Sequence, residues 1–352
     1  MRAHQTSPSR RPTGSLPSIG FVIALAAWLA AALTAQSPPT NQPTNQPTVG
    51  VQSIGQGGSA QSKIPPHQQR TREVPVFFLI GQSNCAGGTN GFWLSHAQQP
   101  GNRWPHLAYQ PYVKIWWPGN TPARPLSVPR WEDYRTGVLD RVNNSNAQLT
   151  EGNFGPEAAF GEAASLGLGE AVYLFKYSVV APMNPAGNPT FSKVPGRVTV
   201  FDDILSDWRR ADAALRSFGL IPKVLGIMII HGEYDMFVPY APTYAQHLSQ
   251  FISDLRTELL AHDPDSEMPK VVLSQLHDRH VPRAQFVNSE NLVRAAQVRV
   301  TQTVPEVYLT ETGDLSLDFQ SPNYVHYDAP GSIRLGARMF ATFADREVPP
   351  RR

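Results

Sequence analysis

Short apolar runs recur from residue 74 onward, and stretches with helical spacing of apolar residues lie between them. Apolar residues recur every three or four positions in 198–219, 243–260, 291–300 and 331–344, as in amphipathic helices. The alternation predicts an α/β fold, a three-layer α/β/α sandwich around a parallel sheet of about five strands. Five runs have the length and composition of strands buried on both faces: VFFLI (76–80), AVYLFKY (171–177), VLGIMII (224–230), VVLSQL (271–276) and VYLTE (307–311).

Residues 1–35 have the layout of a secretory signal peptide. Arg2, Arg10 and Arg11 precede the apolar run IGFVIALAAWLAAAL (19–33), and the small residues of TAQS follow it. The run is shorter than the about 20 residues that a membrane-spanning helix usually needs. We therefore expect export to the periplasm or the cell exterior. The alternative is an uncleaved leader that tethers the protein to a membrane.

Residues 36–72 are rich in Pro, Gln and Thr, contain the near-repeat TNQPTNQPT, and are expected to form a disordered linker. A single folded domain is expected over 73–347. Within it, an insert at about 88–150 is rich in Pro, Gly and Asn, is expected to be irregular, and holds five of the seven tryptophans. Two interpretations remain open, because exposed indole rings suit sugars but tryptophans also cover sheet edges.

Composition narrows the class of protein. The chain has 352 residues, of which 41% are hydrophobic, so it can build one sizeable core. The formal charge of +2 becomes −1 without the three leader arginines, and no Lys/Arg cluster suggests nucleic-acid binding. The single cysteine, Cys85, excludes an intrachain disulfide and is expected to pack as a small apolar residue.

Polar residues follow several of the predicted strands. Ligands of parallel α/β sheets bind beyond the carboxyl ends of the strands, and these ends carry GQSN (81–84) and HGEYD (231–235). Ser83 would stand at a strand-to-helix turn, where backbone N–H groups can receive an oxyanion. The alternative is an ordinary helix N-cap. The glycines match neither phosphate-loop pattern, which argues against a nucleotide ligand.

Four segments in this order resemble the SGNH/GDSL-type hydrolases, most closely the sialate O-acetylesterases and related carbohydrate acetylesterases. The resemblance covers about residues 74–345 and implies a flavodoxin-like SGNH fold and a serine esterase that needs no cofactor. The segments are IGQSNCAGG, FGPEAAFGEAA, IIHGEYD and NYVHYDAPGSIRLGARM.

The resemblance also implies roles for individual residues. Ser83 matches the nucleophile and His326 the base. The oxyanion hole would use the backbone N–H groups of Ser83 and Gly155 and the side chain of His231, which replaces the branch's usual Gln. Asn323 stands where the family commonly has Asp, and an amide can orient an imidazole without stabilising its charge.

Asp318 and Asp328 are alternative acids for orienting His326, although neither has the spacing that the resemblance implies. The HDRH segment contains His277 and His280 but shows no third ligand, so no metal is expected. Glu233 and Asp235 are not expected to act as a glycosidase couple, because residues two apart at a strand end point in different directions. Four residues near the motifs are interpreted as structural: Gln82, Asn84, Glu233 and Asp235.

The expected function is an exported serine esterase that removes O-acetyl groups from carbohydrate of the sialate or plant/algal polysaccharide type. Its partner would be the acetylated carbohydrate, with no nucleic acid or nucleotide. The alternative is a catalytically weak or inactive carbohydrate-binding protein on the same scaffold. A lipase-like or thioester-cleaving relative would instead prefer long acyl chains.

Overall fold

The computed structural model describes residues 71–87, 89–90, 104–117, 129–135, 153–237, 239–278, 287–318 and 325–345. The predicted signal peptide, nearly all of the linker and much of the insert lie outside these residues. None of the described helices is long and apolar enough to cross a membrane. The strands are β1 (Arg72–Gly81), β2 (Thr89–Asn90), β3 (Tyr109–Trp117), β4 (Arg130–Arg135), β5 (Asn153–Phe154), β6 (Val172–Ser178), β7 (Leu220–Ile230), β8 (Lys270–Ser274) and β9 (Val307–Thr310).

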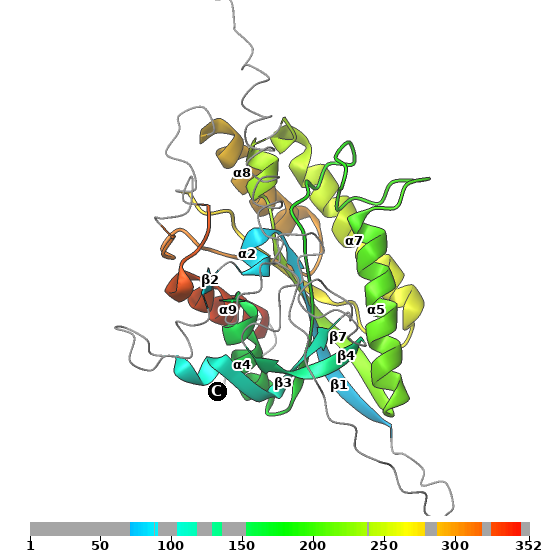
Figure 1. Ribbon diagram of the computed structural model, residues 1–352. Coiled ribbons are helices and arrows are strands. Elements are labelled where there is room, and N and C mark those ends of the chain that lie inside the picture. The colour runs from blue at the N-terminus through cyan, green and yellow to red at the C-terminus, as the bar shows by residue number, and fades with distance from the viewer. Residues whose placement is uncertain are drawn as a thin grey trace, which may run out of the picture. The chain divides into compact units, whose positions relative to one another are not determined.

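Helices follow most of the sheet strands, as Figure 1 shows. The α-helices are α2 (Ser83–Ala86), α4 (Glu157–Leu168), α5 (Val200–Ser217), α6 (Glu233–Phe237), α7 (Tyr244–His262), α8 (Val287–Thr303) and α9 (Ala329–Ala344), and the short 3-10 helices are η1 (Pro105–Ala108) and η2 (Ala241–Thr243). The four predicted helical stretches correspond to α5, α7, α8 and α9.

The central sheet has seven strands in the order β4-β3-β6-β1-β7-β8-β9, and all its pairs are parallel except β3 with β4. The predicted α/β class is confirmed, and the five predicted strands are β1, β6, β7, β8 and β9. The expected strand number was too low, because β3 and β4 come from the insert that was expected to be irregular. Pro111 and Lys114 interrupt the apolar pattern of β3, although Val113 and Ile115 are buried.

The core lies in two layers, one on each face of the sheet. In β1, Val76, Phe78 and Ile80 belong to the cluster that includes residues of α5, α7 and α8. Phe77 and Leu79 belong to the cluster with α4 and α9 on the other face. Successive strand residues point to opposite faces, so a strand apolar at every position needs helices on both sides. Figure 1 shows α5 and α7 across the sheet from α4 and α9.

Two tryptophans of the insert cover the sheet. Trp116 is 1% exposed and donates from Nε1 to Asp207 Oδ1 at 2.9 Å, on α5. Trp131 donates to Ala211 O at 2.9 Å on the same helix, and its ring centroid lies 5.7 Å from that of Trp116. These two indoles therefore pack β3 and β4 against α5. Trp93 lies outside the described residues.

The three central strands β6, β1 and β7 end at the same level, and this positions the GQSN segment (81–84). Gly81 is the register partner of both Ser178 on β6 and Ile230 on β7. A Cβ at Gly81 would lie 2.0 Å from Ile230 O and 2.8 Å from Cys85 Cβ. Glycine is therefore required because neighbouring chain segments approach this position too closely for a side chain. The close approach brings the turn after β1 to the carboxyl edge of the sheet.

Candidate active site

Ser83 is the first residue of α2, which begins directly after the turn at the end of β1. The N-cap of this helix is Gln82, so the alternative interpretation of Ser83 as an N-cap is wrong. Ser83 Oγ lies 2.9 Å from His326 Nε2, although 243 positions separate the two residues in the chain. A hydroxyl and an imidazole are therefore in hydrogen-bond contact at the carboxyl edge of the sheet.

His326 lies in the segment that precedes α9. Its carbonyl accepts from the N–H of Asp318 at 2.8 Å. Burial lowers the pKa of His326 below its ordinary 6.5, and the negative charge of Asp318 opposes this shift. Asp328 is the N-cap of α9 and accepts from Gly331 N at 2.7 Å, so its carboxylate serves the helix. Asn323 lies outside the described residues.

The backbone N–H of Gly155 is hydrogen-bonded to a side chain. The N–H donates to Glu157 Oε1 at 2.7 Å, within the turn that opens α4. A carboxylate in the first turn of a helix is well placed to accept from nearby N–H groups. The predicted oxyanion-hole role of Gly155 is therefore not supported, because its donor is already paired.

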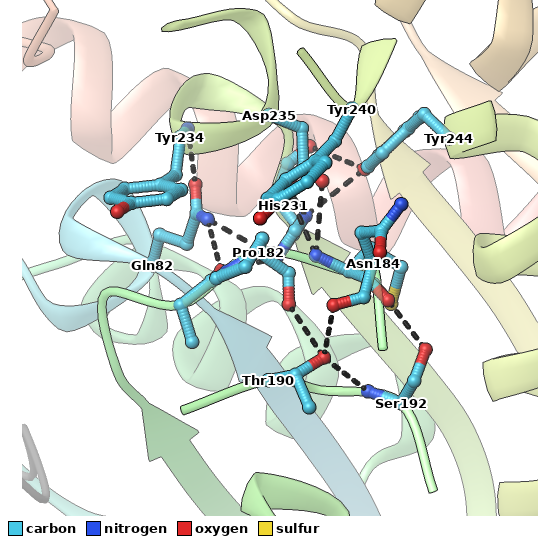
Figure 2. Close-up of polar contacts among 12 residues, drawn as sticks. Gln82, Pro182, Asn184, Thr190, Ser192, His231, Tyr234, Asp235, Tyr240 and Tyr244 are labelled. Carbon is cyan, nitrogen blue, oxygen red and sulfur yellow. Dashed lines mark hydrogen bonds and ion pairs between the residues drawn. The ribbon is translucent and has the colours of Figure 1, made fainter. Parts of the chain in front are cut away.

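His231 is 2% exposed and is surrounded by protein groups on both ring nitrogens (Figure 2). Its Nε2 lies 3.1 Å from Ala181 O and 3.2 Å from Gln82 Nε2, and its Nδ1 lies 3.1 Å from Tyr244 Oη. Burial lowers the pKa of His231 to about 3, so the ring is neutral at pH 7. Protein groups occupy both ring nitrogens of His231, which favours a structural role over the predicted oxyanion role.

Glu233 and Asp235 lie in the one-turn helix α6, whereas the sequence placed them at an extended strand end. Glu233 Oε1 accepts from Asn84 Nδ2 at 2.6 Å, and Asp235 accepts from Met183 N at 3.0 and 3.2 Å. Burial raises the pKa of Glu233 and raises that of Asp235 to about 8. The two acids face different partners, and each binds a neighbouring segment.

Gln82 links three segments around the turn that carries Ser83. Its Nε2 donates to Ala181 O at 2.6 Å, and its Oε1 accepts from Tyr234 N at 3.1 Å. These contacts join the turn after β1 to the loop after β6 and to helix α6 after β7. Figure 2 shows them beside His231.

The family model of the carbohydrate esterases described as sialic acid-specific acetylesterases matches residues 73–345. The chain belongs to this family. It is therefore a carboxylic ester hydrolase, an esterase that acts on acetyl groups of carbohydrate. No curated protein matches the sequence significantly.

Two of the solved structures similar to this chain have TM-scores above 0.5, which shows a shared fold at low sequence identity. A protein from Arabidopsis thaliana has a TM-score of 0.54 and 16% identity, with 77% of this chain and 98% of that chain covered. NanS has a TM-score of 0.54 and 12% identity, with 79% and 99% covered. A carbohydrate acetylesterase from Xanthomonas citri has a TM-score of 0.46 and 14% identity, with 76% and 55% covered.

A buried ion pair lies behind the site of the esterase, and sequence reasoning missed it. Lys176 Nζ lies 2.7 Å from Glu157 Oε2, and both side chains are 0% exposed. Lys176 also donates to Ala86 O at 2.8 Å, at the last residue of α2. A signal was present, because a lysine inside the apolar run AVYLFKY needs a buried partner.

The described residues contain no group of three or more His, Cys, Asp or Glu side chains arranged to hold a metal ion. His277 is buried with Nε2 3.0 Å from Leu315 O, and His280 lies outside the described residues. Cys85 is fully buried, and burial raises the pKa of its thiol to about 11. The thiol is thus protonated at neutral pH, which argues against a nucleophilic role for Cys85.

Proposed function

We propose that this esterase is a serine enzyme that removes O-acetyl groups from carbohydrate, with Ser83 as nucleophile and His326 as general base. The observation that carries the proposal is the 2.9 Å contact between Ser83 Oγ and His326 Nε2. This separation lies within the range needed for proton transfer between a nucleophile and its base.

The mechanism begins when Ser83 Oγ attacks the acetyl carbonyl carbon while its proton moves to His326 Nε2. For this step the neutral imidazole carries its hydrogen on Nδ1 and accepts at Nε2. The tetrahedral intermediate then breaks its bond to the sugar oxygen, which takes the proton from His326. Water then gives a proton to His326 Nε2 as it attacks the acetyl-Ser83 ester. The bond between the acetyl carbon and Ser83 Oγ breaks, acetate leaves, and Ser83 Oγ takes the proton back from His326.

The backbone N–H of Ser83 is the donor that remains for the oxyanion among those predicted, because Gly155 and His231 are paired elsewhere. As the first residue of α2, Ser83 has an N–H group without an acceptor inside the helix. Asp318 supplies negative charge near His326, and we retain Asn323 as the proposed orienting residue on its sequence position alone.

The proposed substrates are acetylated sialic acids or acetylated plant or algal polysaccharides, outside the cytoplasm. Family membership supports the chemical class, and the N-terminal sequence supports export. The insert adds little to the choice of sugar, because Trp116 and Trp131 pack on α5.

The test is acetate release by purified wild type and by Ser83→Ala, with 4-nitrophenyl acetate, acetylated sialic acid and acetylated xylan as substrates. We expect Ser83→Ala and His326→Ala each to lower kcat by at least about a thousandfold, as for other serine hydrolases. Ser165→Ala is the control, since Ser165 Oγ donates to Glu170 O at the far end of α4.

Equal acetate release by wild type and Ser83→Ala would exclude the serine mechanism. Sugar binding without acetate release by wild type would favour the inactive carbohydrate-binding alternative. A series of 4-nitrophenyl esters separates a third possibility, because a lipase-like enzyme prefers long acyl chains whereas an acetylesterase prefers acetate.

A further inference from the structure

Asn84 follows Ser83 in the chain and contacts the backbone on both sides of His326. Its Nδ2 donates to Val325 O at 2.9 Å, and its Oδ1 accepts from Tyr327 N at 3.1 Å. Asn84 is 5% exposed, so these bonds form with little competition from water. Asn84, which follows Ser83, therefore holds the backbone of the two residues that flank His326.

Glu233 fixes which way the amide of Asn84 points. Glu233 Oε1 lies 2.6 Å from Asn84 Nδ2, and a carboxylate or a carbonyl can accept only from the N–H₂ end of an amide. The N–H₂ group therefore faces Glu233 and Val325, which leaves Oδ1 for the N–H of Tyr327. All three bonds agree on one orientation, and the opposite orientation would place oxygen against oxygen at two of them.

The contact also joins three segments that are distant in the chain. Asn84 belongs to α2 after β1, Glu233 to α6 after β7, and His326 to the segment before α9. Glu233 is 6% exposed, and among the described residues its Oε2 has no hydrogen-bond partner. Among the described residues, Asn84 is thus the one side-chain hydrogen-bond partner of this acid, and burying a carboxyl group with so few partners is unfavourable.

We propose that Asn84 and Glu233 are positioning residues that set the separation of Ser83 and His326. The inference rests on the proposed function, since it assigns no contact with substrate to either residue. Catalytic geometry is sensitive to small displacements, and a misplacement of about 1 Å can lower the rate about a hundredfold.

Asn84→Asp is the sharpest variant, because it keeps the size of the side chain and replaces the N–H₂ donor with an oxygen. That oxygen would face Glu233 Oε1 and Val325 O, so the segment carrying His326 would shift. We expect kcat to fall about ten- to hundredfold with KM changed by less than about threefold. The rate at which a fluorophosphonate labels Ser83 should fall in parallel, because labelling also needs the imidazole in place.

The matched control is Gln110→Glu. Gln110 is a buried amide on β3 whose Nε2 donates to Leu107 O at 3.2 Å and Ala158 O at 2.8 Å. The exchange removes an N–H₂ that serves two acceptors, as in Asn84→Asp, but neither acceptor belongs to α2 or to the segment that carries His326. We expect it to lower the unfolding free energy while leaving kcat of the folded enzyme within about twofold of wild type.

Two variants of Glu233 test the same contact without altering Asn84, and they decide the question if Asn84→Asp fails to fold. Glu233→Gln keeps an oxygen acceptor at this position and has nearly the size of Glu. We expect its kcat within about threefold of wild type. Glu233→Met removes the acceptor and is expected to lower kcat about tenfold or more, so the Gln variant acts as the rescue.

A kcat for Asn84→Asp within twofold of wild type would overturn the inference, as would an equal loss in Gln110→Glu. Equal activity of Glu233→Gln and Glu233→Met would also overturn it. Ser83→Ala is assayed in parallel to separate the two proposals. An active Ser83→Ala would overturn the proposed function and this inference with it, whereas an inactive one leaves the outcome to the Asn84 and Glu233 variants.

Discussion

At the scale of single residues, the ionisation of His326 decides when the proposed base can work. Burial lowers the pKa of this imidazole below 6.5, and the negative charge of Asp318 acts in the opposite direction. A base works in its deprotonated form, so the acid limb of kcat/KM should lie below pH 6.5 in the wild type. Among the described residues, Asp318 is the acid whose charge acts on this ring.

Asp318→Asn tests that influence. Without the negative charge, the pKa of His326 falls further, so the acid limb should move to lower pH. The imidazolium that forms in the transition state also loses support, and kcat should fall about two- to tenfold. The measurement is kcat/KM with 4-nitrophenyl acetate from pH 4 to 8.

Asp314→Asn is the control for this prediction, because Asp314 is an exposed acid on the same loop that pairs with Arg338 at 2.6 Å. If the acid limb of kcat/KM stays in place in Asp318→Asn, or moves to higher pH, the role assigned to Asp318 is contradicted.

At the scale of elements, α2 is a single turn whose last carbonyl is held by a buried charge. Lys176 on β6 binds Ala86 O and Glu157, and Glu157 in turn accepts from Gly155 N. The ion pair thus connects β6, α2 and the start of α4 below the proposed nucleophile.

Lys176→Met should destabilise the fold by about 3–5 kcal/mol, because it leaves the carboxylate of Glu157 buried without a countercharge. The double variant Lys176→Met/Glu157→Gln should recover most of this loss, since it removes both charges. Lys193→Met breaks the exposed pair with Glu258 and should change stability by less than about 1 kcal/mol. Urea unfolding monitored by tryptophan fluorescence measures the unfolding free energy of all three variants. Similar losses of stability in Lys176→Met and Lys193→Met would contradict the prediction.

Prediction of elements succeeded where the local pattern was strong. Five apolar runs and four helical stretches were identified from spacing, since each buries a continuous face against the core. β3 was missed because Pro111 and Lys114 break its pattern, and its place in the sheet depends on pairing with β6. α6 was missed because HGEYD is too short to show helical periodicity.

At the scale of the whole molecule, the leader predicts where the protein works. Expressed from its full sequence in a secreting bacterium, the protein should accumulate outside the cytoplasm with a mature N-terminus near Gln36. Intact mass and N-terminal sequencing measure this. The double variant Ile23→Asp/Leu25→Asp should retain the protein in the cytoplasm, because two charges interrupt the apolar run. Full-length protein in the membrane fraction would instead support the tether.

The sequence by itself determined the alternation of strands and helices, the family, and the two side chains that meet at the sheet edge. These features depend on local periodicity and on short motifs, which can be read without knowing what lies nearby. Only the tertiary structure decided that His231 is buried and neutral, that Gly155 is paired with Glu157, and that Asn84 holds the segment of His326. Whether a ring nitrogen, a backbone N–H or an amide can bind a substrate or holds another segment depends on its neighbours in space. Those neighbours come from segments far away in the chain.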